Sequence, residues 1–198
     1  MADDRRVTRI RIAVEPVSAL AEYASVASKF LVTSVLDAQP IPNGLGGWRL
    51  MERLVPVPYE KDYDRLEPPI RWAKQWDLGN WTILAAYPVD GGNRLGGAVV
   101  AHRTPGVHML EGRDDLAALS DIRVHPDARR QGIGHLLFQA ATHEARQRRC
   151  RWLKIETQNT NAGGCRFYAN EGCQLRDVHR GVYLDFPEEV QFIWYCDV

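Results

Sequence analysis

The sequence lacks an excess of charge of either sign, and this limits the partners that electrostatics could bring to it. Lys and Arg total 25, Asp and Glu total 25, and the formal net charge at pH 7 is zero. A protein that binds nucleic acid or an anionic membrane through charge carries a basic excess. We therefore expect no nucleic-acid partner and no membrane partner, and any charge-driven recognition has to be local.

Cysteine is scarce and carries no metal-binding spacing. The chain has four cysteines without a C-x-x-C pair and six histidines without an H-E-x-x-H pattern. Neither a zinc site nor a disulfide framework is indicated, so we expect no metal and reduced thiols, as in a cytoplasmic protein. Cys165 and Cys173 have no nearby histidine in the sequence that could activate a nucleophile, which favours buried thiols.

Long apolar runs are also missing. No stretch approaches the roughly 20 residues of a membrane span, and the N-terminal MADDRRVTRIRIAVEP has charges where a signal peptide needs an apolar core. With 198 residues, 45% of them hydrophobic, the chain can bury one substantial core. We expect a single domain over residues 1–198, in which residues 1–47 form an N-terminal strand, helix and loop.

The first half of the chain alternates short strand patterns with breakers. Asp37–Gly47 concentrates proline and glycine and predicts a loop, and the helix expected after Glu67 would bury a face of Ile70, Ala73 and Trp76. The sequence PVDGGN predicts a hairpin turn between two antiparallel strands. The other elements expected here are strands Val7–Val14, Trp48–Val57, Trp81–Val89 and Leu95–Arg103, and a helix from Ser18.

The second half contains a strand, a helix and a strand in succession. These are Ala117–Val124, His135–Arg149 and Trp152–Thr157, and such a crossover makes its two strands parallel. A helix Gly163–Asn170 and strands Cys173–Val178 and Val190–Tyr195 complete the chain. The fold class is therefore α/β (α+β), with a mixed sheet that contains a parallel pair.

A glycine-containing turn precedes the central helix. It consists of Arg129, Arg130, Gln131, Gly132, Ile133 and Gly134. Glycines allow close backbone approach, and the free N–H groups of a first helical turn favour an anion such as a pyrophosphate. Taken alone, the turn fits an ordinary helix start equally well. A nucleotide P-loop is excluded because His135 and Leu136 replace its Lys-Ser/Thr pair, and a Rossmann turn because Leu137 replaces its third glycine.

A second group of polar residues lies downstream at fixed spacing. R-x-x-G-x-G from Arg129 is followed by Glu156, Asn161 and Tyr168 in the order E-x4-N-x6-Y. Together these motifs resemble the GCN5-related N-acetyltransferase (GNAT) superfamily. The resemblance implies a GNAT fold, with a mostly antiparallel sheet of about seven strands, one parallel central pair and flanking helices.

The same resemblance implies acetyl-CoA as the acetyl donor and residues 117–178 as its binding core. Ile122, Arg123 and Val124 would offer backbone groups to the pantetheine arm, and Asn161 would contact that arm. Tyr168 would protonate the departing thiolate. The pyrophosphate would be wrapped by residues from Arg130 through His135.

The chemistry of amine acetylation supplies its own reasons for these residue types. An alkyl amine has a pKa of about 10.4, so presenting it neutral at pH 7 costs roughly 4 to 5 kcal/mol, and some group must accept its proton. Glu156 is the first candidate for this base and Asp121 the second. An ion pair between Glu156 and Lys154 is the alternative. Tyr168 has a phenol proton to give.

A narrower resemblance runs from Trp48 to the C-terminus. VPYEKDYD, IETQNTNAGGCRFYANEGC and GVYLDFPEEVQFIWY are similar to segments of the streptothricin acetyltransferases, which implies acetylation of a small cationic amine and antibiotic resistance. A protein or peptide acetyltransferase and a non-catalytic acyl-CoA-binding module remain alternatives, and a homodimer is left open. Gly164 departs from the family's alanine and Cys173 from its aromatic residue, which we expect to affect stability rather than chemistry.

Overall fold

A seven-stranded sheet forms the centre of the computed structural model, which describes residues 9–43 and 45–198. Its spatial order is β1-β4-β5-β6-β7-β9-β8, and only the β6–β7 pair is parallel. The predicted mixed sheet with one parallel pair is confirmed, although residues 7 and 8 of the expected first strand lie outside the described residues. The strands are β1 (Ile10–Glu15), β4 (Thr82–Pro88), β5 (Gly96–His102), β6 (Leu116–Val124), β7 (Trp152–Gln158), β8 (Gln174–Arg180) and β9 (Val190–Asp197).

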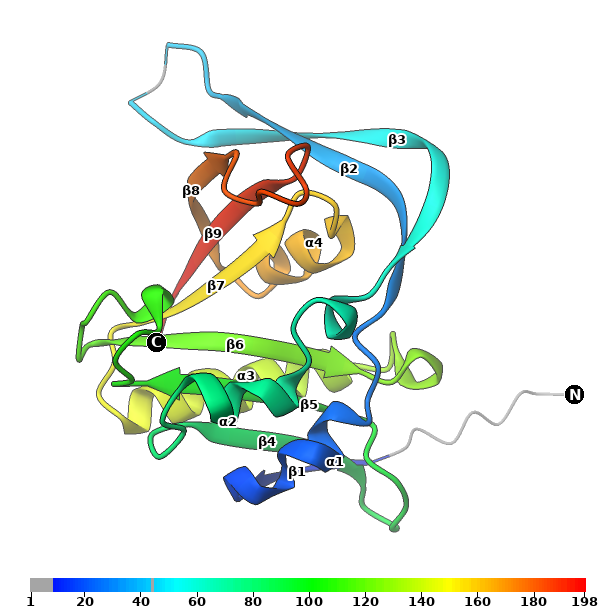
Figure 1. Ribbon diagram of the computed structural model, residues 1–198, viewed down its shortest axis with the longest axis vertical. Coiled ribbons are helices and arrows are strands. Elements are labelled where there is room, and N and C mark those ends of the chain that lie inside the picture. The colour runs from blue at the N-terminus through cyan, green and yellow to red at the C-terminus, as the bar shows by residue number, and fades with distance from the viewer. Residues whose placement is uncertain (1–8, 44) are drawn as a thin grey trace, which may run out of the picture.

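Helices cover both faces of this sheet (Figure 1). The helix α3 (Ile133–Gln147) packs on one face through an apolar stripe at helical spacing, which is almost fully buried and consists of Ile133, Leu137, Ala141 and Ala145. The short helices α1 (Leu20–Ala24) and α2 (Trp72–Gln75) lie on the other face. Successive strand residues point to opposite faces. Accordingly, Leu84 belongs to the core on the α3 side, and its neighbour Ile83 to the core beneath α1 and α2.

The helix predicted after Glu67 is present but short, and the predicted face is wrong for Ile70 and Ala73, which are exposed. A 3-10 turn at Pro69–Arg71 leads into an α2 of only four residues, and Ile70 is 52% exposed. Trp72 is buried instead, with its ring 5.7 Å from that of Trp81. In a segment this short, the burial of large aromatic rings determines which side faces the core.

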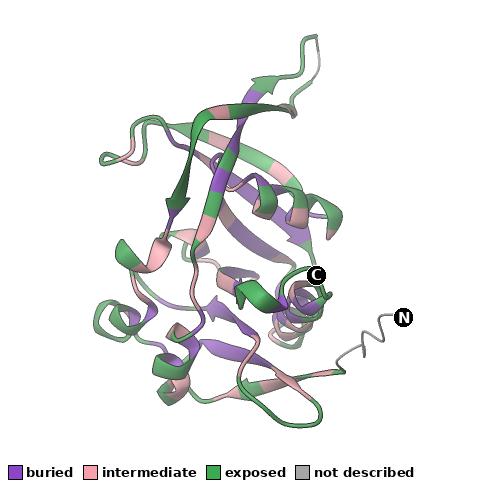
Figure 2. Cartoon of the chain, turned by 90° about the vertical axis from the view of Figure 1, so that its right-hand side faces the viewer, coloured by how far each residue is buried: buried purple, intermediate pink, exposed green. Residues whose placement is uncertain are grey.

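A long hairpin arches over the sheet and α4 (Figure 1). It pairs β2 (Phe30–Pro40) with β3 (Trp48–Lys61) as a separate two-stranded sheet. The predicted loop Asp37–Gly47 is therefore wrong at its start, because residues 37–40 continue β2. Leu36 and Ala38 on β2 are buried in the main core, whereas β3 is mostly exposed (Figure 2).

The parallel strands β6 and β7 separate after four residue pairs. Their pairing runs only from Leu116–Trp152 to Leu119–Ile155, although both strands continue. Against β5 the register skips Ser120, which leaves a β-bulge at the point of separation. A bulge bends its strand. The two strands therefore diverge, and α4 (Ala162–Asn170) follows β7 (Figure 1). We call the region between residues 120–124 of β6 and residues 156–158 of β7 the opening.

The helices of residues 9–43 and 45–198 are all too short or too polar to span a bilayer.

Candidate active site

Free backbone N–H groups gather at the start of α3. Arg130 and Gly132 adopt left-handed conformations, with φ of 63° and 80°, and turn the chain into the helix. Among the described residues, no backbone or side-chain acceptor bonds the N–H groups of residues 130–135. A Cβ on Gly132 would point into open space. Unpaired amides at the positive end of a 15-residue helix suit a phosphate group.

The side chains of this turn are mostly engaged elsewhere. Arg129 donates to the backbone oxygens of Val124 at 3.0 Å and Lys29 at 2.9 Å, and His135 Nδ1 lies 2.9 Å from Glu171. Gln131 donates to the Asp127 carbonyl, and Ile133 is buried in the core. The fit to a pyrophosphate therefore rests on the backbone of the turn, and the roles predicted for these side chains stay predictions.

Beside the opening, β6 has an edge without a strand partner. Its residues 120–124 continue past the last pair with β7, so the backbone groups of Ile122, Arg123 and Val124 on that edge could receive an extended ligand. The side chain of Arg123 is buried. Its guanidinium pairs with Asp121, lies 3.0 Å from an Asp64 oxygen and donates to the Val26 carbonyl at 2.9 Å.

Asp121, the second candidate for the base, is tied into this cluster. One of its oxygens, Oδ2, accepts from Arg123 Nε at 2.6 Å and from the Tyr23 hydroxyl at 2.7 Å. Burial raises the pKa of Tyr23 well above its usual value, and the charge of Asp121 raises it further. Asp121 is therefore held in an ion pair with Arg123.

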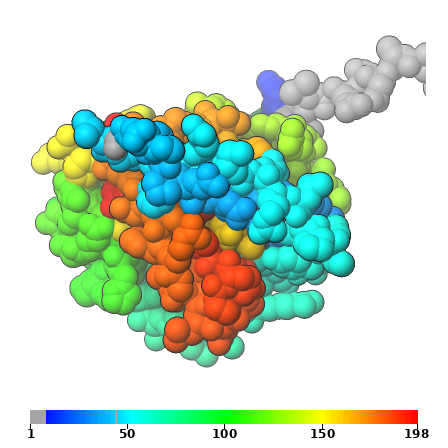
Figure 3. All heavy atoms as spheres, turned by 90° about the horizontal axis from the view of Figure 1, so that it is seen from above, coloured from blue at the N-terminus to red at the C-terminus, as the bar shows by residue number. Residues whose placement is uncertain are grey.

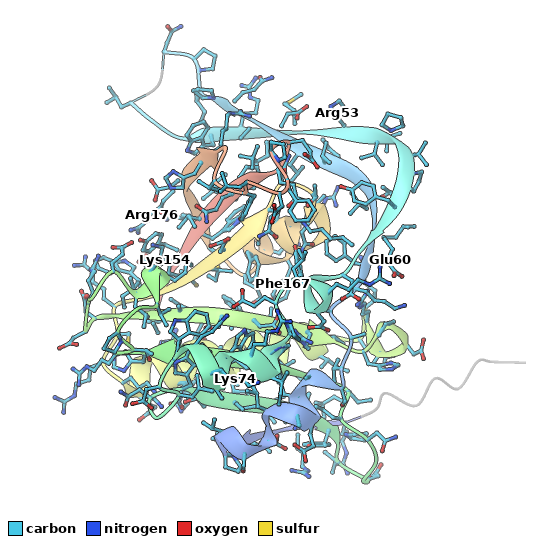
Figure 4. The ribbon with its side chains drawn as sticks, in the orientation of Figure 1. Arg53, Glu60, Lys74, Lys154, Phe167 and Arg176 are labelled. Atoms are coloured by element: carbon cyan, nitrogen blue, oxygen red, sulfur yellow. The ribbon has the colours of Figure 1, made fainter. Side chains whose placement is uncertain are left out.

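Glu156 is the first residue of β7 past the parallel pairing. Its carboxylate accepts a hydrogen bond of 2.7 Å from the hydroxyl of Tyr183 in the β8–β9 loop. The alternative ion pair with Lys154 is wrong, because Lys154 lies toward the start of β7 (Figure 4) and bonds Glu111 at 2.5 Å. Glu156 has no ion-pair partner among the described residues.

The helix α4 carries Asn161 and Tyr168. Asn161 caps the helix, with its side-chain oxygen accepting from the Gly164 N–H at 2.9 Å. Tyr168 is buried against the rings of Phe138 and Phe167, and Phe167 lies between α4 and β6 in Figure 4. Burial raises the pKa of Tyr168 well above its usual value and the charge of Asp121 adds to this, so the phenol is protonated at neutral pH.

Gly164 leaves space for the side chain of Asn161, which caps the helix. A Cβ there would lie 2.8 Å from the side-chain nitrogen of Asn161 and 2.9 Å from its oxygen. The expected alanine would therefore collide with the residue that caps the helix. Gly164 makes room for the cap, and its effect on stability stays a prediction.

Three polar residues near Glu156 were not found from the sequence. Tyr183 bonds Glu156, Gln158 bonds Tyr183, and Tyr63 bonds Gln158. The Tyr63 contact spans 95 positions and the Tyr183 contact 27, so no local spacing could reveal them. All four cysteines are free and buried, as the sequence indicates.

The comparisons with known proteins agree with this arrangement. The family model described as the acetyltransferase (GNAT) family matches residues 48–172. The chain belongs to the GNAT family. It is therefore an N-acetyltransferase that takes its acetyl group from acetyl-CoA.

Two curated proteins and one solved structure are similar to this chain. Streptothricin acetyltransferase A of Bacillus subtilis is 33% identical over 152 residues, which cover 76% of this chain and 80% of that protein. Streptothricin acetyltransferase of Escherichia coli is 25% identical over 94% of this chain and 95% of its own length. A Bacillus anthracis structure in complex with acetyl coenzyme A has the same fold, with a TM-score of 0.77, 22% identity and coverage of 96% and 100%.

Proposed function

We propose that this GNAT enzyme acetylates a primary amine of a small cationic molecule of the streptothricin type, with Glu156 as the general base and Tyr168 as the general acid. The observation that carries the proposal is the lone carboxylate of Glu156 at the opening between β6 and β7. It has no basic partner among the described residues, so an incoming ammonium group can take that place. The similarity to two streptothricin acetyltransferases supports the choice of acceptor.

Several other acidic groups are already paired with basic side chains. Asp64 pairs with Arg123, Glu111 with Lys154, and Glu189 with Lys61. Further pairs neutralise Glu60, Asp62, Asp114 and Asp115. Their charges are balanced within the fold, and this supports Glu156 as the group that attracts a cationic acceptor.

The proposed reaction accounts for every proton that is transferred. Glu156 removes one proton from the acceptor ammonium and frees the nitrogen lone pair, which attacks the thioester carbon. The carbon–sulfur bond breaks, and the sulfur takes the phenol proton of Tyr168. The second proton of the nitrogen restores Tyr168, and Glu156 releases the first to solvent. The products are the N-acetylated amine and free CoA.

The binding of acetyl-CoA is assigned to a core of residues 117–178 within a single domain of residues 1–198. The free amides of residues 130–135 would hold the pyrophosphate, and the open edge of β6 the pantetheine arm, with Asn161 beside it. Gly132→Asp adds bulk and negative charge at the first of these places. We expect it to weaken CoA binding at least tenfold in a calorimetric titration, and an unchanged affinity would contradict the placement.

The acceptor is tested by release of free CoA. We expect the enzyme with acetyl-CoA to release CoA rapidly with streptothricin and slowly with N-terminal or lysine-containing peptides of the same charge. The reverse preference would favour a peptide acetyltransferase. No release with any amine, despite CoA binding, would favour a non-catalytic acyl-CoA-binding module.

A further inference from the structure

We propose that Tyr183 is a positioning residue for Glu156, and that Tyr183, Gln158 and Tyr63 form a one-directional chain of hydrogen bonds that orients the Glu156 carboxylate and stabilises its ionised form. The proposal rests on the base role of Glu156 in the proposed function. It adds the residues that orient and stabilise the carboxylate.

The direction of every bond in the chain is fixed by the chemistry of its groups. The Tyr63 hydroxyl donates to the Gln158 side-chain oxygen at 2.6 Å. The Gln158 side-chain nitrogen has only protons to offer, so at 3.0 Å it donates to the Tyr183 oxygen. The Tyr183 proton is then directed to Glu156 Oε1 at 2.7 Å. Successive bonds of the same sense polarise one another and strengthen the last one.

Both tyrosines stay protonated donors at neutral pH. Burial raises the pKa of Tyr63 and of Tyr183 above the usual tyrosine value, and the charge of Glu156 raises that of Tyr183 further. Tyr183 therefore keeps its proton and stabilises the ionised carboxylate. Because its bond uses Oε1, Oε2 of Glu156 is left to receive the proton of the acceptor ammonium.

A buried ion pair connects the two segments that carry Tyr63 and Tyr183. Lys61, at the end of β3, pairs with Glu189, at the end of the β8–β9 loop, and both side chains are at least nine-tenths buried. The Lys61 ammonium lies 5.3 Å from the ring centre of Tyr63 and 5.4 Å from that of Phe186. Seen from above, the hairpin and this loop lie next to each other (Figure 3).

The loop itself is folded by two tight turns. The Phe186 N–H donates to the Tyr183 carbonyl at 3.1 Å, and the Glu189 N–H to the Phe186 carbonyl at 2.9 Å. These bonds connect the position of Tyr183 to that of Glu189. The ion pair therefore anchors Tyr183 as well as Tyr63.

Other ionisable groups lie near this series of hydrogen bonds without bonding Glu156. Asp121 on β6, Glu189 in the loop and Cys165 on α4 act on Tyr63 through their charges, and Lys154 on β7 is paired with Glu111. Among the described residues, Tyr183 is the hydrogen-bond donor to Glu156. A change in the pH dependence of the Tyr183→Phe variant can therefore be assigned to the loss of this bond.

The test is the pH dependence of kcat/KM for acetyl transfer. In Tyr183→Phe the Glu156 carboxylate loses the donor that stabilises its ionised form. We expect the acid limb of the profile to move upward by about one pH unit, the size of one hydrogen bond to a charged group. Tyr63→Phe should move it in the same direction by less. Tyr195→Phe is the matched control, because it removes a hydroxyl bond to Glu111 at the other end of β7 and should leave the limb in place.

An unmoved limb in Tyr183→Phe, or an equal shift in Tyr195→Phe, would overturn the proposal. If Tyr183→Phe fails to fold by near-ultraviolet circular dichroism, Tyr63→Phe decides, and an unmoved limb in that variant has the same consequence. Failure of the base role appears separately, because the ratio of Glu156→Gln to wild-type kcat/KM would then stay constant with pH.

Discussion

At the scale of single residues, Tyr168 combines a phenol proton with surroundings that keep it in place. Its ring lies within a cluster of aromatic rings, and its hydroxyl has no hydrogen-bond partner among the described residues. Burial and the charge of Asp121 hold its pKa above the usual value. Tyr168 therefore carries its proton at neutral pH and can offer it to a departing thiolate.

Tyr168→Phe keeps the ring and removes this proton. We expect turnover to fall by roughly 10² to 10⁴, the usual contribution of a general acid, while CoA affinity and the unfolding temperature change little. Steady-state kinetics and a CoA titration measure the two effects. Turnover at the wild-type level would assign Tyr168 to packing alone.

Glu156→Gln keeps the shape of the side chain and removes its ability to accept a proton. Turnover at neutral pH should drop, and it should recover partly as the pH approaches the value of about 10.4 at which an amine loses its own proton. The measurement is the ratio of variant to wild-type kcat/KM from pH 6 to 10. A ratio that stays constant over this range would transfer the role of base to Asp121 or to solvent.

At the scale of elements, the start of α4 depends on space that only glycine leaves. The Asn161 side chain caps the helix in the volume that a Cβ of residue 164 would fill. The neighbouring Gly163 has no atom within 4 Å of its Cβ position. A methyl group at position 164 would therefore meet the Asn161 side chain, whereas one at position 163 would meet open space.

Gly164→Ala should lower the free energy of unfolding by about 1 kcal/mol, because it displaces the cap. Gly163→Ala, the matched control, should raise it by about 0.4 to 1 kcal/mol by restricting the unfolded chain. Urea denaturation measures both. A stabilised Gly164→Ala would mean that the cap contributes little.

Elements with a strong local pattern could be predicted from the sequence, and elements made by distant contacts could not. The apolar stripe of α3 and the Asp-Gly-Gly turn between β4 and β5 act within a few residues, so periodicity reveals them. The sequence predicts a loop for residues 37–40, the last four of β2, because proline and glycine mark the nearby turn. The site divides in the same way: Glu156, Asn161 and Tyr168 share one motif, whereas Tyr63 and Tyr183 reach Glu156 through tertiary contacts.

At the scale of the whole molecule, the opening between β6 and β7 is surrounded by parts of the chain that lie far apart in sequence. The β2–β3 hairpin, the β8–β9 loop and α4 meet there, and the Lys61–Glu189 pair joins the first two. A buried pair stabilises little by itself, but losing one partner leaves a buried charge. The site and the integrity of the fold are therefore coupled through the loop that carries Tyr183.

The tyrosines provide a test of this coupling that needs no substrate. The chain has seven tyrosines, and the pKa of each is raised in the folded protein, first of all by burial. In the unfolded chain they ionise near the usual value of about 10. Above that pH the unfolded state loses protons that the folded state retains, so the stability that is fully present below about pH 10 declines as the pH rises.

We expect the unfolding temperature to fall steeply above this pH, with the most buried residues, Tyr23 and Tyr168, ionising only as the fold opens. Absorbance at about 295 nm and circular dichroism, recorded in one alkaline titration, should therefore change together for these residues, while the chain in urea titrates near pH 10. Ionisation of all seven near pH 10 with the circular dichroism unchanged would show that these hydroxyls are accessible in the folded enzyme.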